Sequence, residues 1–146
     1  MPSFESLPAF QPLVLFSTLL ALKMGAVAFV TAFARSRSKV VVNPEDVPVN
    51  PGSHPEAQDA PATLRAKRAH SNDAENIPVF LVLALLFTMT GCSATAGWAY
   101  FGTYFVARTL HTTFYLRAVQ PWRTATFAIG QLTQLGIIVQ MLMKVL

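Results

Sequence analysis

The chain has 146 residues, enough for one domain, and its formal net charge is +4 at pH 7. Hydrophobic residues make up 53% of it and charged residues only 12%, against about 25% in ordinary soluble domains. A soluble chain of this length could not bury so much apolar surface, so the composition predicts an integral membrane protein. The absence of a long basic run argues against nucleic acid as a partner. A single cysteine, Cys92, excludes intrachain disulfides and metal-binding cysteine pairs, and we expect no metal site.

Four apolar segments are candidates to cross a bilayer, which takes about 20 helical residues. They predict transmembrane helices at about residues 10–34, 62–90, 94–116 and 121–146. The apolar core of the second, residues 77–89, is too short to span alone, so its polar first turns must lie at or below the membrane surface if it spans. Backbone groups in lipid must find their hydrogen bonds within the protein. The expected fold class is therefore all-α, a four-helix bundle that forms a single membrane domain over residues 1–146.

A polar stretch at about residues 36–61 separates the first two predicted helices. Its many prolines predict a loop, which opens into a helix near Pro61, a favourable first helical residue. Basic residues flank this loop and the third connection: Arg35, Arg37, Lys39, Arg65, Lys67, Arg68, Arg117 and Arg123. Positive charge marks the cytosolic side of a membrane protein. We therefore expect the first and third loops in the cytosol and both termini on the opposite side.

Three polar side chains share one face of the third predicted helix. Arg108, His111 and Tyr115 are three and four residues apart, the spacing that aligns side chains along a helix. An arginine in lipid costs at least ~3 kcal/mol and normally faces the protein interior or a wet cavity. A fixed charge, a ring nitrogen and a hydroxyl together are suited to hold a polar, anionic ligand inside a membrane bundle.

The second predicted helix begins with a polar cluster. Its members are Arg68, His70, Asn72, Asp73 and Glu75. A solvated helix start often has such residues, but the short apolar core brings these groups towards lipid, where carboxylates and amides need partners. Arg108 and Arg35 are the counter-charges that we expect to meet them.

Further polar residues lie in the first and fourth predicted helices. Lys23, in the middle of the first, needs a partner such as Glu75 or a backbone carbonyl, and we expect a structural ion pair. Residues 123, 127, 131 and 134 share roughly one face of the fourth helix. Arg123 either reaches the lipid headgroups or contacts a ligand, and Gln131 and Gln134 either line the site or bond to neighbouring helices.

These residues predict a polar cavity that opens to the cytosol and holds a small ligand with carboxylates and an amine. Arginine binds carboxylates through two parallel hydrogen bonds, and Glu75 would accept from an ammonium group. The apolar surface beside the cavity would admit a lipophilic second substrate.

Three motifs then point to a family. They are Asn43-Pro44-Glu45-Asp46, Arg68-Ala69-His70-x-Asn72-Asp73-x-Glu75-Asn76-Ile77 and Arg108-x-x-His111-Thr112-x-x-Tyr115-Leu116. The residues of these motifs and their order along the chain resemble those of the MAPEG family, the membrane-associated proteins in eicosanoid and glutathione metabolism. The resemblance covers nearly the whole chain. The resemblance implies a homotrimer of four-helix subunits that binds glutathione between neighbouring subunits, near the cytosolic face.

The resemblance also implies roles for single residues. Those that would bind glutathione or support its site are Arg35, Arg68, His70, Asn72, Asp73, Glu75, Arg108, His111, Tyr115 and Arg123. Arg123 and the hydroxyl of Thr124 would favour the reactive thiolate, and Asp46 matches a loop aspartate that assists in the prostaglandin synthase branch. That branch has serine at Thr124, arginine at Ser71 and an aromatic hydroxyl at Phe127, and these departures favour the transferase branch.

The expected function is a membrane-bound glutathione transferase with a detoxification role, which conjugates the glutathione thiolate to lipophilic electrophiles. Attack on a peroxide oxygen would add a glutathione peroxidase activity. The alternatives are a glutathione-dependent isomerase of the prostaglandin E synthase type, a non-catalytic scaffold that binds membrane lipid, and an ion-paired bundle without ligand. A bacterial inner membrane and the endoplasmic reticulum fit the pattern equally well.

Overall fold

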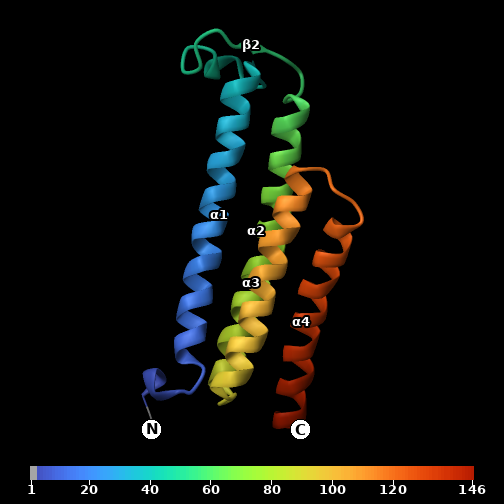
Figure 1. The fold of residues 1–146 in the computed structure, drawn as a ribbon. Helices are drawn as coiled ribbons and strands as arrows, with labels where there is room; N and C mark the ends of the chain where they lie inside the picture. Colours follow the sequence, from blue (N-terminus) through green and yellow to red (C-terminus); the bar gives the residue numbers. More distant parts are fainter. Residues whose placement is uncertain (1–2) are drawn as a thin grey trace.

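Four long helices account for most of the computed structural model, which describes residues 3–146 (Figure 1). Their bounds are α1 Phe10–Ser38, α2 Pro61–Met89, α3 Ala94–Leu116 and α4 Trp122–Val145, and a 3-10 turn, η1 Phe4–Ser6, precedes them. The predicted all-α, four-helix fold is confirmed. The first helix runs four residues beyond its predicted end, and the other three begin and end within one residue of prediction.

Local sequence explains where the helices begin and end. Lys39 ends α1 in the left-handed conformation, with φ of 55°. Pro61 is the first residue of α2, a position whose backbone N–H needs no helical partner. Gly91, with φ of 72°, makes the short turn into α3, and the Ser93 hydroxyl caps that helix by accepting from the Ala96 amide at 3.1 Å.

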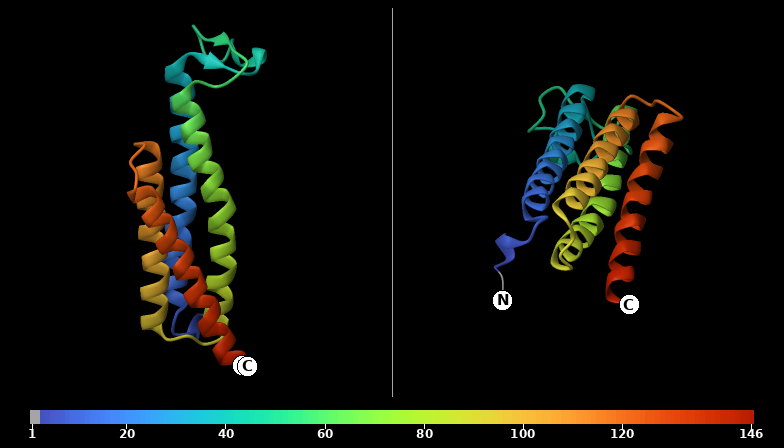
Figure 2. Two further views of the ribbon diagram at one scale, coloured as in Figure 1. Left: turned by 90° about the vertical axis from the view of Figure 1, so that its right-hand side faces the viewer. Right: turned by 60° about the horizontal axis from the view of Figure 1, so that its bottom comes forward.

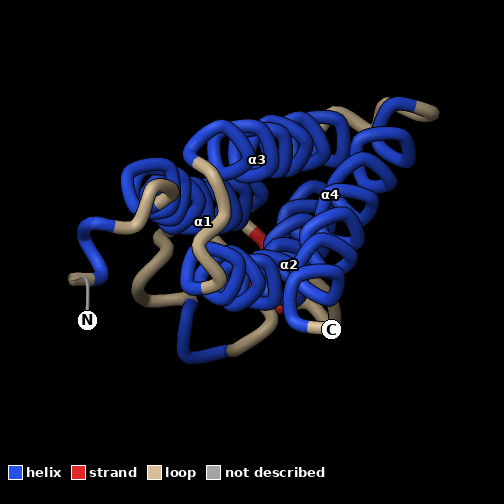
Figure 3. The backbone as a smooth tube through the Cα atoms, turned by 90° about the horizontal axis from the view of Figure 1, so that it is seen from below, coloured by secondary structure: helices blue, strands red, loops and turns tan. Residues whose placement is uncertain are grey.

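The helices form a bundle in which α1 and α4 lie on opposite sides of α2 and α3 (Figures 1 and 3). Both chain ends lie at one end of the bundle, and the α1–α2 loop and α3–α4 connection lie at the other (Figure 1). This is the relative arrangement of termini and loops that the charge pattern predicts. The 29-residue helices α1 and α2 exceed the length that a bilayer needs, and they extend past α3 and α4 at the loop end (Figure 1).

Within residues 3–146, three helices are long and apolar enough to cross a membrane: α1, α2 and α4. α3 is long enough, with 23 residues, and lies alongside the other helices, but its mean hydropathy is too low for this assignment. Its polar residues explain the difference, because Tyr104, Arg108 and His111 are all buried inside the bundle. The low hydropathy of α3 therefore reflects its polar interior face.

The core combines aliphatic and aromatic side chains with little exposed surface. Leu20, Ile77 and Ile137 bring α1, α2 and α4 together. The Phe80 ring lies flat on the Tyr104 ring, with centroids 3.6 Å apart, and this stack joins α2 to α3. Aromatic pairs of this kind add to the free energy of apolar burial.

The loop between α1 and α2 has structure of its own (Figure 2). Its elements are a two-residue strand β1 Val40–Val41, a 3-10 turn η2 Pro44–Asp46 and a strand β2 His54–Pro55, which pairs with β1 in parallel. The buried carboxylate of Asp59 then contacts Lys67 on α2 and Arg35 on α1, the latter at 3.4 Å. Asp59 therefore fastens the end of the loop to both helices.

Cys92 lies in the turn between α2 and α3, where a small residue is expected. Its side chain is buried, and this burial raises the pKa of the thiol above its ordinary value. A raised pKa lowers the fraction of thiolate, the reactive form, so a structural role fits Cys92.

A glycine permits a close contact between the start of α1 and α3. A Cβ at Gly97 would lie 2.9 Å from both the Ala9 Cβ and the Pro12 Cγ, whereas a Cβ at Gly25 would meet nothing within 4 Å. We expect Gly97→Ala to lower the free energy of unfolding by about 1–2 kcal/mol, because overpacking outweighs the gain in helix propensity. Gly25→Ala should leave it unchanged or raise it. Reversible unfolding in detergent would compare the two, and equal effects would contradict the close packing at Gly97.

Candidate functional site

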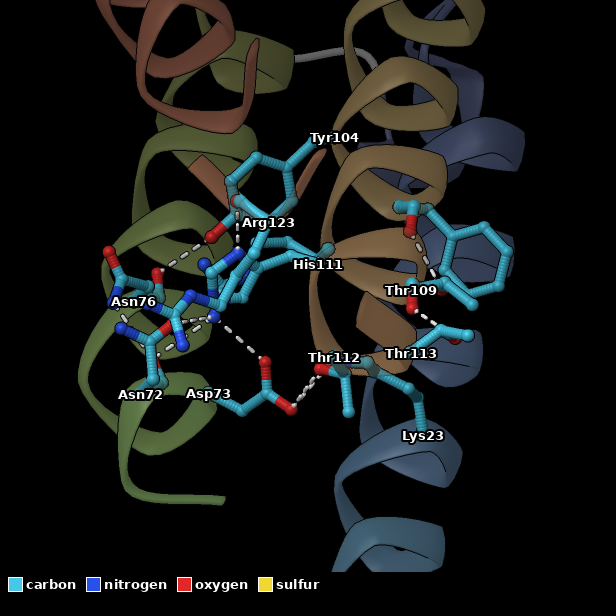
Figure 4. A network of polar contacts seen from close by, with 12 residues as sticks. Lys23, Asn72, Asp73, Asn76, Tyr104, Thr109, His111, Thr112, Thr113 and Arg123 are labelled. Atoms are coloured by element: carbon cyan, nitrogen blue, oxygen red, sulfur yellow. Dashed lines mark hydrogen bonds and ion pairs between the residues drawn. The ribbon is translucent and has the colours of Figure 1, made fainter. Parts of the chain in front are cut away.

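A buried carboxylate joins three helices near the middle of the bundle. Asp73 of α2 is fully buried and contacts Lys23 Nζ of α1 at 2.5 Å and Arg108 Nη2 of α3 at 2.8 Å (Figure 4). The Thr112 hydroxyl accepts from Lys23 at 2.6 Å and donates to Asp73 Oδ2 at 3.1 Å. One negative and two positive groups thus share a water-poor interior.

This network corrects one expectation. The partner of Lys23 is Asp73, with Thr112, and Glu75 is exposed. Residues two apart on a helix point in different directions, so Asp73 and Glu75 cannot both face the interior. The expected pairing of Arg108 with a carboxylate of α2 is confirmed, whereas Arg35 pairs with Asp59 of the loop.

Arg108 also orients an amide beside it. Its Nη2 donates to Asn72 Oδ1 at 2.5 Å and to the Asn72 carbonyl at 3.1 Å. The other two guanidinium nitrogens, Nε and Nη1, are buried and have no partner among residues 3–146. Because the Asn72 side-chain oxygen is taken, its amide nitrogen is the part left to meet a ligand.

A second set of polar contacts joins α4 to α2 and α3. Gln131 Nε2 donates to Asn76 Oδ1 at 2.7 Å, and Gln134 Nε2 donates to the Tyr104 hydroxyl at 3.4 Å. The Tyr104 hydroxyl in turn donates to the Asn76 carbonyl at 3.0 Å (Figure 4). Of the two interpretations left open for the glutamines, helix-to-helix hydrogen bonding is the one observed.

Two cavities meet at the loop end of α2, α3 and α4, and together we call them the groove. One, of about 320 Å³, is lined by Pro61, Leu64, Arg65, Arg68, Tyr115, Ala118 and Arg123. The other, of about 260 Å³, is lined by Asn72, His111, Tyr115, Arg123, Thr124 and Phe127. Tyr115 and Arg123 belong to both. Of the side chains that the structure describes, three arginines and no carboxylate line the groove, so its chemistry favours an anion.

Arg123 occupies the centre of the groove. Its guanidinium lies over the Tyr115 ring, 4.8 Å from the centroid, at cation–π distance. The Gln120 amide is oriented by its neighbours, so that its oxygen accepts from Arg123 Nε at 3.1 Å and Nη2 at 2.7 Å, and its nitrogen donates to Thr124 Oγ1 at 3.1 Å. Arg123 and Thr124 are thus held side by side at the first turn of α4.

His111 connects the groove to the start of α4. Its Nδ1 lies 2.9 Å from the Arg123 carbonyl oxygen, which can only accept, so Nδ1 has the proton. Its ring meets the Tyr115 ring edge to face, at 5.8 Å between centroids. His111 Nε2 is buried and has no partner among residues 3–146. The predicted common face of Arg108, His111 and Tyr115 therefore runs from the buried network to the groove.

The other predicted site residues lie elsewhere in this chain. Arg35 and Asp46 line a third cavity of about 270 Å³, at the loop end of α1, which shares no residue with the groove. His70 is half-buried, and its Nδ1 has no partner within the described residues 3–146. Glu75 is exposed, and neither residue is among those that line the groove. Asp73 is enclosed by its partners, a position that suits a supporting role.

Sequence reasoning missed two residues of this region, Arg65 and Gln120. Arg65 precedes Arg68 by three residues, and Gln120 precedes Arg123 and Thr124 by three and four. Helical spacing could have indicated Arg65. Gln120 lies in the turn before α4, where side-chain direction depends on the local backbone.

Comparison with known proteins places the chain among membrane enzymes. A model of the MAPEG family matches residues 4–143. The chain is 36% identical to a prostaglandin E synthase of Homo sapiens over 138 residues, which cover 94% of this chain and 90% of that protein. It is 36% identical to the prostaglandin E synthase of Mus musculus, with 99% and 93% covered. It is 33% identical to microsomal glutathione S-transferase 1 of Bos taurus, with 83% and 81% covered.

Two carboxylates on α2 offer a test of the buried network. Asp73→Ala would leave Lys23 and Arg108 buried without a counter-charge, and we expect the free energy of unfolding to fall by about 3–5 kcal/mol. Glu75→Ala removes an exposed carboxylate two residues away and should change it by less than about 0.5 kcal/mol. Reversible unfolding of both variants in the same detergent is the measurement. Similar losses for the two would mean that the network does not stabilise the bundle.

Proposed function

This chain belongs to the MAPEG family, and we propose that it is a membrane-bound glutathione transferase that conjugates glutathione to lipophilic electrophiles. The observation that supports this most is Arg123 beside Thr124 in an arginine-lined groove that holds no carboxylate. Relatives of the chain include a microsomal glutathione S-transferase and prostaglandin E synthases, so a glutathione-dependent enzyme is the function common to the proposal and its nearest alternative.

The residues of the groove fit glutathione, which has two carboxylates, an ammonium group and a thiol. Arg65 and Arg68 of α2 offer guanidinium groups for a carboxylate, and the Asn72 amide nitrogen offers a further donor. The ammonium group needs an acceptor that the groove of one chain does not supply. Asp46 or Glu75 of a neighbouring subunit would provide it.

Once bound, glutathione supplies a thiol, whose thiolate is the nucleophile. A cysteine thiol has an ordinary pKa of about 8.5, so the site must favour the charged form at neutral pH. Arg123 lowers the energy of a nearby anion by its charge, and Thr124 does so by donating a hydrogen bond. Arg68 and Asn72 hold the remote ends, and His111 steadies the first turn of α4 through the Arg123 carbonyl. The exposed apolar faces of the helices give a lipophilic substrate access from the membrane.

A homotrimer completes the site in this proposal. Arg35 and Asp46 lie on the α1 side of the bundle, and the groove lies on the side of α4 (Figures 1 and 3). In a closed ring, head-to-tail contacts would bring the α1 side of one subunit to the α4 side of the next. Arg35 and Asp46 of one subunit would then face the groove of its neighbour.

The groove would face the cytosol. It lies at the loop end of the bundle, which holds most of the basic residues of the connections, and positive charge favours the cytosolic side. A bacterial inner membrane and the endoplasmic reticulum present the same cytosolic face.

The nearest alternative is an isomerase of the prostaglandin E synthase type, favoured by the relatives of that name. The two reactions differ in the fate of the thiol. Conjugation of a chlorinated nitroaromatic forms a C–S bond, releases chloride with the bonding electrons, and consumes one glutathione per product. Isomerisation of a fatty-acid endoperoxide returns the thiol. Thiol loss per product therefore separates them, and a protein that binds no glutathione at all would instead fit a lipid scaffold.

Two arginines of the groove should differ in their effects on turnover. We expect Arg123→Ala to lower kcat about 100-fold, because it removes the charge beside the reacting sulfur. Arg68→Ala should mainly raise the KM for glutathione, about tenfold, because it holds a remote carboxylate. Steady-state conjugation of the chlorinated nitroaromatic by the detergent-purified protein measures both. Equal and negligible losses in the two variants would refute the assignment.

Mixed oligomers test the shared site. Arg35→Ala and Arg123→Ala should each inactivate every site of a uniform trimer. When the two variants are expressed together, random mixing leaves about a quarter of the interfaces with both arginines intact, so about a quarter of the wild-type activity should return. Activity that stays at the average of the two single variants would show that both arginines act within one subunit or that Arg35 has no part in the reaction.

A further inference from the structure

We propose that Gln120 is a positioning residue, which sets the direction of both the Arg123 guanidinium and the Thr124 hydroxyl towards the bound thiol. This inference rests on the proposed function and adds a residue to it that lies outside the family motifs described above. Gln120 belongs to the turn between α3 and α4, two residues before α4 begins at Trp122.

The Gln120 amide contacts both groups at once. Its oxygen lies 3.1 Å from Arg123 Nε and 2.7 Å from Nη2, so one edge of the guanidinium is bound as a pair. Its nitrogen lies 3.1 Å from Thr124 Oγ1. The opposite amide orientation would turn an N–H₂ group against two guanidinium donors, which cannot accept a hydrogen bond. Arg123 therefore determines the orientation of the amide, and the amide in turn restrains Thr124.

The Arg123 guanidinium is restrained by two contacts, one along its edge and one on its face. Gln120 binds the edge formed by Nε and Nη2, and the Tyr115 ring covers one face at 4.8 Å. Nη1 makes no hydrogen bond to the rest of the described chain, residues 3–146, and remains for a ligand in the groove. An arginine has several rotatable bonds, and two such contacts remove most of this freedom before a ligand arrives.

For Thr124, the contact explains a departure from the other threonines of α4. Thr126 and Thr133 donate to backbone carbonyls four residues before them, those of Trp122 and Ile129, as helical threonines commonly do. Thr124 instead meets the side chain of Gln120. A hydroxyl that accepts from the amide nitrogen keeps its own hydrogen for another acceptor, and the thiolate sulfur would be that acceptor.

The charged side chains that line the groove within one chain are all positive: Arg65 and Arg68 of α2, and Arg123 of α4. His111 and Tyr115 of α3 are its other ionisable groups, and among the described residues of this chain no carboxylate lines it. In the proposed trimer, Arg35 and Asp46 of the neighbouring subunit add one charge of each sign. A neutral amide at position 120 therefore fixes Arg123 and leaves its charge for the ligand, whereas a carboxylate there would neutralise it.

The test compares Gln120→Ala and Gln120→Glu with wild type in glutathione-dependent conjugation. Glutamate has nearly the shape of glutamine and keeps the acceptor for Arg123, but it adds a negative charge and loses the donor to Thr124. Gln140→Ala and Gln140→Glu are matched controls, because Gln140 is an exposed glutamine near the other end of α4 that donates to the Tyr100 hydroxyl at 2.7 Å. Melting temperatures in detergent check that every variant is folded.

We expect Gln120→Ala to lower kcat about tenfold, the value of one hydrogen bond to a charged group, with the KM for glutathione within about twofold of wild type. The rise of kcat with pH should move to higher pH, because a less ordered Arg123 favours the thiolate less. Gln120→Glu should move it further, since its carboxylate pairs with Arg123. The ultraviolet absorbance of the bound thiolate at neutral pH should fall in the same order. The Gln140 variants should match wild type.

A double-mutant cycle separates the two contacts. If Gln120 acts partly through the hydroxyl, Thr124→Val should cost less in the Gln120→Ala background than in wild type. Unchanged kcat and pH dependence in both Gln120 variants would overturn the inference and leave the transferase intact. Wild-type protein that shows neither turnover nor a thiolate signal would overturn the proposed function itself.

Discussion

The bundle is organised around one buried carboxylate. Asp73 contacts Lys23 and Arg108, and so joins α1, α2 and α3 at one depth in a membrane protein where apolar surface gives little preference for one helix arrangement over another. Charges buried in this way stabilise a fold only while every partner is present, because each unpaired ion would bear its full desolvation cost. The network thereby selects one register of the three helices.

That register places the groove. Arg108 donates to the side-chain oxygen of Asn72, and one turn further along α3 His111 donates to the Arg123 carbonyl. These contacts fix the positions of Asn72, His111 and Arg123, which line the groove. The same arrangement therefore positions the ion pairs of the interior and the arginines of the groove. Asp73 offsets one of the two buried positive charges, whereas the groove arginines have no carboxylate beside them among the described groove residues.

The helices differ in where their polar side chains lie relative to the membrane. α1, α2 and α4 meet the membrane with apolar outer faces, whereas α3 contributes the buried cation Arg108, together with His111 and Thr112, to the interior. The loop end extends beyond the level of α3 and α4 and holds the arginines that would meet a soluble anion (Figure 2). In the proposed function, a polar cosubstrate from the aqueous phase and a lipophilic one from the bilayer would meet at this point.

The sequence by itself determined the membrane class, the four helices to within a few residues, and the common face of Arg108, His111 and Tyr115. These follow from composition and from the fixed geometry of the helix, which are local properties. Its motifs also indicated the MAPEG family, to which the chain belongs. Only the tertiary structure decided which polar groups meet: that Lys23 pairs with Asp73 rather than Glu75, that Gln131 and Gln134 bond to neighbouring helices, and that Arg35 and Asp46 lie apart from the groove. Partners between helices depend on the rotation and depth of each helix in the bundle, and spacing along one helix does not specify either.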